Sequence, residues 1–308
     1  MTTLSVLSGG LLTTVQDLGR EGFGALGVSA SGAADALSLR IGNRMLGNPE
    51  GAASLEMTLL GGAFRFSGDV QVAVSGSDFG AMVEGKPAAP YTVFRVNSGQ
   101  TLQFGPTKTG ARAYLCVRGG IDVPKALGSR STHLLSGLGG FEGRALRKGD
   151  VLPIGDDSGC RTSRVNTVGW NDSSSKPWKI RVTKGPQWES FSSSARINFL
   201  EQPFVVTEEA NRMGIRLKGL QHELASTGEM ITEGVSLGAI QVTPSGQPII
   251  LFVEQQTTGG YPKIANVIAA DLSLVGQLRP RDEIRFELVS MEAAGLFYLE
   301  QERMLGAG

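Results

Sequence analysis

The sequence of 308 residues lacks a net charge, because Lys plus Arg and Asp plus Glu each number 29. Such a balance gives no general attraction to nucleic acid or to an anionic membrane surface. Histidine is scarce as well: His133 and His222 are the only two, and neither stands at metal-ligand spacing from another His, a Cys or paired carboxylates. We therefore expect no nucleic-acid partner, no membrane contact and no metal site.

Cysteines and long apolar runs are also few. Cys116 lies in a strand-like segment and Cys160 in a polar loop, so the chain has no disulfide framework and suits a reducing compartment. The N-terminus carries no basic region of the kind that opens a signal peptide, and no run of about 18 apolar residues occurs. These absences predict a cytoplasmic protein.

The motifs of several common enzyme classes are missing. The stretch "GPTKTGAR" (105–112) fails as a phosphate-binding P-loop, because no lysine follows its second glycine. The stretch "GLGGFEG" (137–143) fails as a dinucleotide fingerprint, because its third glycine is one place late and no βαβ unit surrounds it. No G-x-S-x-G elbow appears. The chain therefore has neither a nucleotide-binding motif nor a serine-hydrolase signature of its own.

Glycine is abundant, with 43 residues, roughly twice its usual share. Runs of Val, Ile, Leu and Phe recur between glycine-rich turns, at 69–76, 91–96, 101–105, 111–119 and 248–255. This pattern is typical of many strands joined by tight turns, hence of a barrel or sandwich. A turn that feeds an alternating strand occurs three times, at 98–104, 148–154 and 280–286, which indicates a duplicated architecture.

Few segments predict helices. The best is 31–48, where Ser31 can cap, Asp35 favours the first turn and Gly47 can end the helix. A second, short helix is expected within 271–277. Between 155 and 179 the alternation gives way to Ser, Asp, Asn and Gly, which predicts a boundary. We place an N-terminal subdomain at 1–160, a polar linker at 161–178 and a C-terminal subdomain at 179–308.

Five clusters of polar, mostly uncharged side chains stand where strands stop and glycines begin, at 13–22, 118–132, 211–217, 232–242 and 254–268. Turn chemistry and surface pairing explain any one of them more simply than function does. Their shared composition favours a different interpretation, because amides, hydroxyls and backbone N–H groups recognise a neutral ureido, imide or amide group and stabilise an oxyanion that develops on it. We predict that the loops converge on one pocket.

The last cluster, "EQQTTGGYPKIANVI", follows the buried run "IILFV". Alternation puts Gln255 and Thr257 on one face of the strand end, and Gly259 and Gly260 allow close approach of a ligand. Tyr261 can stack on the ligand or donate a hydrogen bond to it.

Charged side chains near the clusters are candidates for two roles, each with structural pairing or capping as the alternative. The candidate carboxylate clamps are Arg20, Arg118, Arg130 and Arg212. The candidate acids and bases are Asp17, Asp35, Asp122, Glu56 and Glu233.

Several stretches together resemble the biotin-dependent carboxyltransferase family, also called the allophanate hydrolase subunit 2 family. They include "TTVQDLGREGFGALGVSASGAADALSLRIGN", "YLCVRGGIDVPKALGSRST", "NRMGIRL", "EGVSLGAIQV", "GQPIILFVEQQTTGGYPKIANVI" and "QLRPRDEIRF". The likeness runs through nearly the whole chain in the right order. The family includes the C subunit of bacterial 5-oxoprolinase, and also the carboxyltransferase domain of urea amidolyase.

The resemblance implies a mainly β fold with few short helices, arranged as two cyclophilin-like β-barrel subdomains. It implies partners: the homologous B subunit, from the allophanate hydrolase subunit 1 family, and the A subunit of 5-oxoprolinase. It implies no covalently bound cofactor, because the Met-Lys-Met biotinylation tripeptide is absent. Carboxybiotin would come on another chain, and ATP would be used by the complex.

The resemblance also implies a set of site residues. Those expected to be catalytic are Arg130, Arg212, Asp17 and Glu233, with the two arginines as carboxylate or phosphate binders. Those expected to bind substrate are Gln16, Arg20, Arg118, Gly119, Gly120, Asp122, Ser129, Gln241, Gln255, Thr257, Thr258, Gly259, Gly260 and Tyr261. The sequence departs from the family pattern beside the site at Glu254, where Asp is common, and this change bears on substrate preference.

Three functions fit the resemblance. The first is a component of a 5-oxoprolinase-type complex, which opens 5-oxoproline to glutamate with ATP. The second is a carboxyltransferase that moves a carboxyl group from carboxybiotin to urea or a related small amide. The third is a regulatory interaction protein, because one family member antagonises a sporulation kinase inhibitor.

Overall fold

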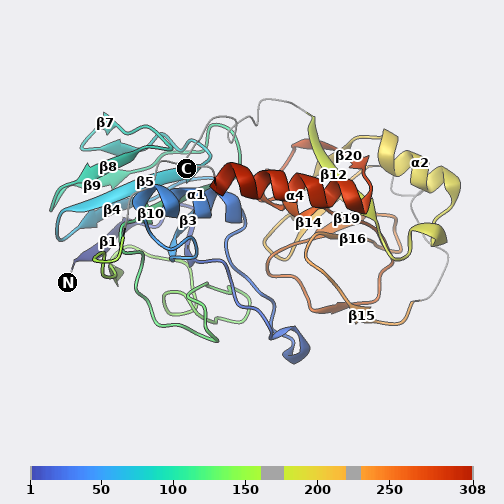
Figure 1. The fold of residues 1–308 in the computed structure, drawn as a ribbon, viewed down its shortest axis with the longest axis horizontal. Coiled ribbons are helices and arrows are strands. Elements are labelled where there is room, and N and C mark those ends of the chain that lie inside the picture. Colours follow the sequence, from blue (N-terminus) through green and yellow to red (C-terminus); the bar gives the residue numbers. More distant parts are fainter. Residues whose placement is uncertain (1, 161–176, 220–229, 307–308) are drawn as a thin grey trace. The chain divides into compact units, whose positions relative to one another are not determined.

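A computed structural model describes residues 2–160, 177–219 and 230–306 of the chain. The chain separates into two compact units (Figure 1). Unit 1 comprises Met1–Arg20, Ser31–Asn171 and Met304–Gly308, and unit 2 comprises Glu21–Ala30 and Asp172–Arg303.

Unit 1 contains two antiparallel sheets. One sheet has the order β11-β1-β4-β9-β6-β7; its strands are β1 (Thr3–Ser8), β4 (Ala63–Phe66), β6 (Met82–Val83), β7 (Lys86–Pro87), β9 (Thr101–Gln103) and β11 (Val151–Pro153). The other has the order β2-β3-β10-β5-β8; its strands are β2 (Leu12–Gln16), β3 (Ser54–Thr58), β5 (Val70–Gly76), β8 (Val93–Val96) and β10 (Arg112–Val117). One hydrophobic core draws buried side chains from both sheets, among them Leu4, Phe64, Leu55, Val72 and Leu115.

Helix α1 (Ala36–Leu46) covers the outer face of the second sheet, where Leu39 and Ile41 pack with Tyr114 and Cys116 of β10. Gly42 makes this close packing possible, because a Cβ there would lie 2.6 Å from the Cys116 sulfur. A short 3-10 helix, η1 (Gly24–Leu26), precedes it in the chain and belongs to unit 2.

Unit 2 is built on a closed barrel with the order β12-β19-β16-β17-β14-β13-β20. Its strands are β12 (Trp178–Lys184), β13 (Phe204–Val206), β14 (Gly214–Lys218), β16 (Ala239–Val242), β17 (Pro248–Leu251), β19 (Lys263–Val267) and β20 (Glu283–Leu288). A separate two-stranded ribbon pairs β15 (Glu233–Gly234) with β18 (Thr258–Gly259). The helical segments are η2 (Trp188–Ser190), α2 (Ser193–Glu201), η4 (Ala269–Asp271), α3 (Leu272–Val275) and α4 (Met291–Gly306), whose last turn is assigned to unit 1.

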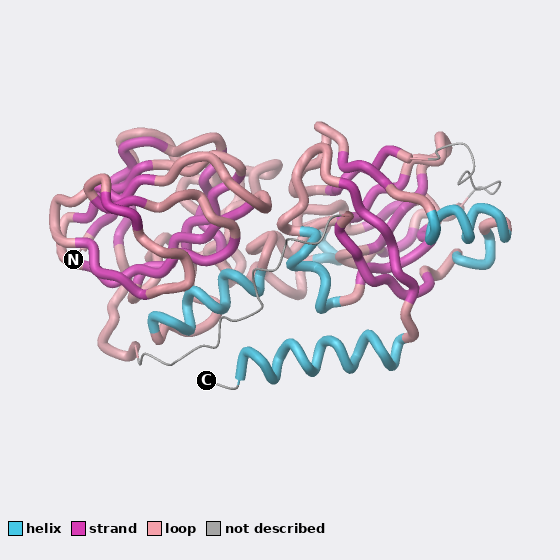
Figure 2. Tube along the Cα trace, turned by 90° about the horizontal axis from the view of Figure 1, so that it is seen from above, coloured by secondary structure: helices cyan, strands magenta, loops and turns pink. Residues whose placement is uncertain are grey.

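Aromatic side chains fill the unit 2 core where α2 meets β20. Phe199 of α2 stacks on Phe286 of β20 with ring centroids 4.5 Å apart, and Phe204 of β13 lies 5.6 Å from Phe286. Ring pairs of this kind add about 0.5–1.5 kcal/mol to the stability gained from burial alone. Strands dominate both units, as Figure 2 shows.

The predicted mainly β class is confirmed, and the five apolar runs correspond to β5, β8, β9, β10 and β17. The three repeated turns lead into β9, β11 and β20. The predicted helices at 31–48 and 271–277 are present as α1 and α3. Residues 161–176 of the predicted linker lie outside the described residues.

Two sequence expectations about helices are wrong. Asp35 caps α1, because its carboxylate accepts from Ser38 N at 2.9 Å. Ser31, the expected cap, instead donates to Thr132 O at 2.9 Å. Helices α2 and α4 were not expected: apolar residues in "MEAAGLFYLEQERMLG" do not keep to one helical face, so periodicity does not reveal α4. No helix in the described part of the chain is long and apolar enough to cross a membrane.

Candidate functional site

Three of the five polar clusters meet in unit 2. The first link joins 211–217 to 254–268: Glu254 N donates to Arg212 O at 2.8 Å, and the Arg212 guanidinium donates to Glu254 Oε1 at 2.5 Å. Both side chains are buried. A buried ion pair is costly to break, because removal of either partner leaves an uncompensated charge. Arg212 and Glu254 therefore fix the start of the last loop against the start of β14.

The β15–β18 ribbon joins the clusters at 232–242 and 254–268. Glu233 lies opposite Gly259 in the ribbon, and Gly234 opposite Thr258. Just beyond, Val235 N donates to Thr257 O at 3.1 Å, and Gln255 Nε2 donates to Val235 O at 3.3 Å. The two loops are therefore held side by side by backbone and amide hydrogen bonds.

A hollow of about 220 Å³ lies on the outer face of the barrel beside this ribbon. Ile215, Ile240 and Ile250 of β14, β16 and β17 are fully buried, and side chains of a strand alternate between its two faces. The intervening residues consequently point outward. The lining residues are Asn211, Met213, Gly214, Arg216, Gln241, Thr243, Ile249, Leu251, Gln256 and Tyr261. The hollow is smaller than the roughly 300–1,000 Å³ of drug-sized pockets, so it suits a compact molecule.

Neutral amides give the hollow its chemistry. Gly259 packs directly against two of them, because a Cβ at this glycine would lie 2.6 Å from Gln241 Nε2 and 2.8 Å from Gln256 Nε2. Gln241 Nε2 also donates to Tyr261 O at 3.3 Å. Gln255 Oε1 is buried and has no hydrogen-bond partner among the described residues. A buried acceptor without a donor costs free energy, but Gln255 does not line the hollow, so this cost falls on the loop beside it.

Glu233 ties the ribbon to the barrel. Its Oε1 lies 2.5 Å from Lys263 Nζ and accepts from Gln187 Nε2 at 3.0 Å. The adjacent ammonium group of Lys263 first, and the Gln187 amide second, lower the pKa of the Glu233 carboxyl below its ordinary value. Glu233 is thus held ionised at neutral pH, which is the state of an electrostatic anchor rather than of a poised general acid.

The remaining residues predicted in this region lie around the hollow. Tyr261 lines it, with 42 % of its surface exposed. Thr257 is half-buried, Thr258 is exposed, and Gly260 follows the ribbon as a half-buried residue. Gln241 and Tyr261 are therefore the predicted substrate-binding residues that the hollow itself contains.

The other two clusters meet in unit 1, around Asp17. Its Oδ1 accepts from Ser129 Oγ at 2.7 Å, from Gly19 N at 2.8 Å and from the Ser131 hydroxyl. Its Oδ2 accepts from Arg130 N at 2.6 Å. Asp17 is buried, and these four bonds occupy much of what a carboxylate can accept.

The arginines of this cluster bond to backbone carbonyls of the same loop. Arg20 Nη2 donates to Ser131 O at 2.5 Å. Arg130 Nε donates to Val123 O at 2.8 Å, and its Nη2 pairs with Asp122. Gln16 Nε2 donates to Thr132 O at 3.1 Å. These hydrogen bonds hold the loop that contains Val123 and Thr132 against β2 and the residues that follow it.

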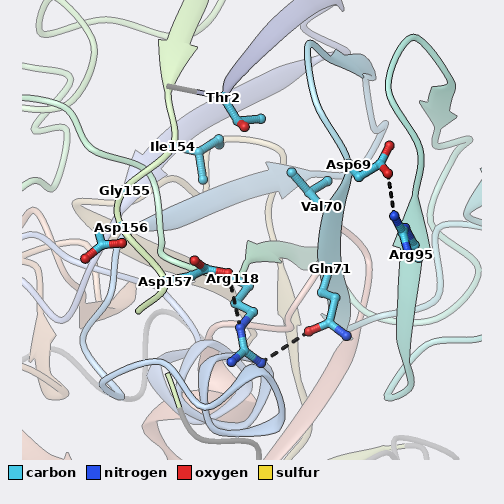
Figure 3. Close-up of a pocket in the computed structure, with 10 residues that line it drawn as sticks. All are labelled: Thr2, Asp69, Val70, Gln71, Arg95, Arg118, Ile154, Gly155, Asp156 and Asp157. Carbon is cyan, nitrogen blue, oxygen red and sulfur yellow. Dashed lines mark hydrogen bonds and ion pairs between the residues drawn. The ribbon is translucent and has the colours of Figure 1, made fainter. Parts of the chain in front are cut away.

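Arg118 lies apart from the Asp17 cluster, at a hollow of about 810 Å³ in unit 1 (Figure 3). Its guanidinium donates to Gln71 Oε1 at 3.2 Å and to Cys160 O at 2.6 Å, while Arg95 pairs with Asp69 elsewhere in the lining. Gly119 and Gly120 follow with φ of 89° and 74°, which forms the turn after β10. This hollow is larger, but its charged groups already have partners: Arg118 pairs with Asp157, Arg95 with Asp69, and Asp156 accepts from Ser158. We therefore take the unit 2 hollow as the candidate site.

Sequence reasoning missed several lining residues. Arg216, Thr243 and Gln256 line the hollow, and Lys263 lies beside Gln241. The signal was present for Arg216, which lies between the apolar residues Ile215 and Leu217 of β14, whereas Thr243 follows the end of β16. The sequence does not indicate a role for Lys263, because a lysine that follows Tyr-Pro is expected to be an exposed turn residue.

Comparison with known proteins gives a consistent result. The family model "Carboxyltransferase domain, subdomain A and B" matches residues 26–288. The chain is 39% identical to the 5-oxoprolinase C subunit of Haemophilus influenzae, over 95% of each chain, and 37% identical to the 5-oxoprolinase C subunit of Escherichia coli, over 97% of this chain and 96% of that one. The crystal structure of the K. lactis urea amidolyase matches with a TM-score of 0.89 and 33% identity, over 98% of this chain and 20% of that one.

Proposed function

The chain belongs to the carboxyltransferase domain family with subdomains A and B, and from that premise we propose that it is the C subunit of a 5-oxoprolinase-type complex. In this complex, the A and B subunits supply the remaining groups for ATP-dependent opening of 5-oxoproline to glutamate. The observation that carries the proposal is the near-complete, two-sided match to two proteins that bear the name of the 5-oxoprolinase C subunit.

The groups that line the hollow are complementary to those of a lactam. A five-membered lactam presents one carbonyl oxygen and one N–H in a fixed planar arrangement. Gln241 and Gln256 line the hollow, so their amide N–H groups can donate to the oxygen, and the hydroxyl oxygen of Tyr261 can accept from the N–H. Donors fixed before reaction stabilise charge that develops on the carbonyl oxygen more than they stabilise the ground state.

A second candidate is transfer of a carboxyl group from carboxybiotin to urea or a related small amide. The urea amidolyase match over 98% of this chain favours it. The same neutral groups fit a ureido group, because the ring of carboxybiotin contains a planar N–C=O with one remaining N–H, the other nitrogen carrying the carboxyl group. Carboxybiotin would come on another chain, while Gln241, Gln256 and Tyr261 bind and orient the N–C=O group.

The test is activity of the chain with and without its partners. We expect no turnover of 5-oxoproline by the purified chain, and ATP-dependent glutamate formation when the A and B subunits are added. Gln241→Ala should lower kcat/KM of the complex about 10²-fold, as loss of one oxyanion donor does. Gln103→Ala, at an exposed position of β9, is the matched control and should leave kcat/KM unchanged.

The two candidates predict different associated proteins. A biotinylated polypeptide that copurifies, with avidin-sensitive carboxylation of urea, would support the carboxyltransferase and contradict the 5-oxoprolinase assignment. Vigorous turnover of 5-oxoproline by the chain alone would contradict the need for partners.

A further inference from the structure

Lys263 lies in the same row of residues as the candidate site. Across neighbouring strands, Arg216 of β14 is opposite Ile249 of β17, Ile249 is opposite Gln241 of β16, and Gln241 is opposite Lys263 of β19. Directly opposite residues share a face of the sheet, with Cβ atoms about 4.5–5.5 Å apart. The first three line the hollow, so Lys263 continues their row.

A β-bulge produces this placement. The pairing passes from Ile240 opposite Ala265 to Gln241 opposite Lys263, which leaves Ile264 as an extra residue in β19. Bulges re-aim side chains and are over-represented beside functional sites. Here the bulge puts an ammonium group beside an amide that lines the hollow.

The Lys263 side chain is only 4 % exposed, although it is charged. Its Nζ lies 2.5 Å from Glu233 Oε1, and no hydrogen bond of good geometry to Nζ is present within the described part of the chain. Buried lysines are rare unless they are paired. Among the described residues, Glu233 is therefore the partner that offsets the cost of burying the Lys263 charge.

Gln187 supports the same contact from the other side. It accepts from Lys263 N at 3.0 Å and donates to Glu233 Oε1 at 3.0 Å. Glu233 itself is about half exposed, and it stands opposite Gly259 in the ribbon. A chain of contacts thus runs from the barrel strand through Glu233 to the glycine that packs on Gln241 and Gln256.

We propose that Lys263 is a positioning residue of the hollow: its ion pair with Glu233 holds the β15–β18 ribbon on the barrel, so that Gly259 keeps the amides of Gln241 and Gln256 in place. This rests on the proposed function for its kinetic consequence, but the ribbon's attachment is a property of the chain itself. Lys263 acts through other residues and touches no substrate in this scheme.

The test combines hydrogen exchange on the full chain with kinetics of the complex. Lys263→Met removes the ammonium with little change in shape, and Glu233→Gln removes the carboxylate at a half-exposed position that tolerates the change. Both should raise amide exchange in the ribbon peptides 230–237 and 254–262 about 10-fold or more, while exchange in β14 and β17 stays unchanged. In the complex, KM should rise about 10-fold and kcat should change less.

Lys184→Met is the matched control, because Lys184 belongs to the same barrel but pairs with Glu189 at 3.4 Å on the exposed surface. In Lys184→Met, the rate of amide exchange in the ribbon and the KM of the complex should equal those of the wild type. Unchanged ribbon exchange in both Lys263→Met and Glu233→Gln would overturn the proposal. So would faster exchange with an unchanged KM.

Failure of the proposed function gives a different result. If the wild-type complex turns over neither a lactam nor a carboxybiotin donor, the function is wrong, and ribbon exchange alone then decides the role of Lys263. If Lys263→Met does not fold, the Glu233→Gln comparison decides it.

Discussion

In unit 1, Asp17 is surrounded by hydroxyl and backbone N–H donors that bond to both of its oxygens. In unit 2, Gln255 Oε1 is just as enclosed, but no described residue donates to it. The two clusters have similar sequences, because both contain amides, hydroxyls, arginines and glycines at strand ends. Unit 1 also contains an acceptor of this kind, Gln16 Oε1, so an unpartnered buried oxygen does not by itself mark a recognition site. What sets unit 2 apart is a hollow lined by the neutral amides of Gln241 and Gln256.

The largest expected effect is on stability, in unit 1. Asp17→Asn replaces one carboxylate oxygen by an N–H₂ group that faces a buried donor, removes the charge that strengthens the other bonds, and so costs about 1–3 kcal/mol for each donor left without an acceptor. We expect a loss of roughly 3 kcal/mol or more in the free energy of unfolding, measured by urea denaturation. Asp69→Asn, at an exposed ion pair, should cost less than about 1 kcal/mol.

The same variant tests the comparison by kinetics. If Asp17 is a structural tie, the folded fraction of Asp17→Asn should keep its turnover in the complex. Normal stability combined with lost turnover would instead make Asp17 a catalytic residue, and the contrast between the clusters would fail.

The second effect concerns activity, in unit 2. Gly259→Ala introduces a Cβ that must displace the Gln241 and Gln256 amides, which are the ends of flexible side chains and can move at small cost in stability. We expect kcat/KM of the complex to fall about 10- to 100-fold while the thermal midpoint shifts by only a few degrees.

Gly234→Ala is the control for this change. Gly234 lies in the same ribbon, and a Cβ there would meet nothing within 4 Å. Equal losses of activity in both variants would show that the ribbon tolerates no alanine, and would remove the amide contacts from the explanation.

The sequence alone does not predict most of the difference between the two clusters. Short apolar runs between glycine-rich turns predict β5, β10 and β17. They do not show which strand lies next to which, so the row that joins Arg216, Gln241 and Lys263 depends on barrel closure and one bulge. Of the candidate site, Gln241 and Tyr261 were predicted to contact substrate, while Gln256 and Lys263 were not.

A third, smaller effect distinguishes the amide of Gln255 in unit 2 from the amide of Gln16 in unit 1. Gln255→Met removes the amide that donates to Val235 O beside the ribbon, so it should cost about 1 kcal/mol of stability and, by loosening the loop beside the hollow, raise KM about 10-fold. Gln16→Met removes an amide whose Nε2 makes two hydrogen bonds, to Thr14 Oγ1 and Thr132 O. It should cost about 1–3 kcal/mol of stability and leave KM unchanged. The opposite assignment of the two effects would reverse the roles of the clusters.

The smallest effect is the response of the ribbon to pH. The pKa of Glu233 is lowered by Lys263 and Gln187, so the stabilisation by its ionised form is complete above the ordinary carboxyl pKa of about 4.3 and is lost as pH falls through the lowered value. Ribbon protection against exchange, corrected for the intrinsic rate, should therefore be constant from neutral pH down to about pH 5 and decrease a few-fold only in stronger acid. In Glu233→Gln the protection should be low throughout and independent of pH, because no carboxylate remains to be protonated. A wild-type loss of protection that begins near neutral pH would point to a group other than Glu233, and would separate the ribbon's attachment from the Lys263 ion pair.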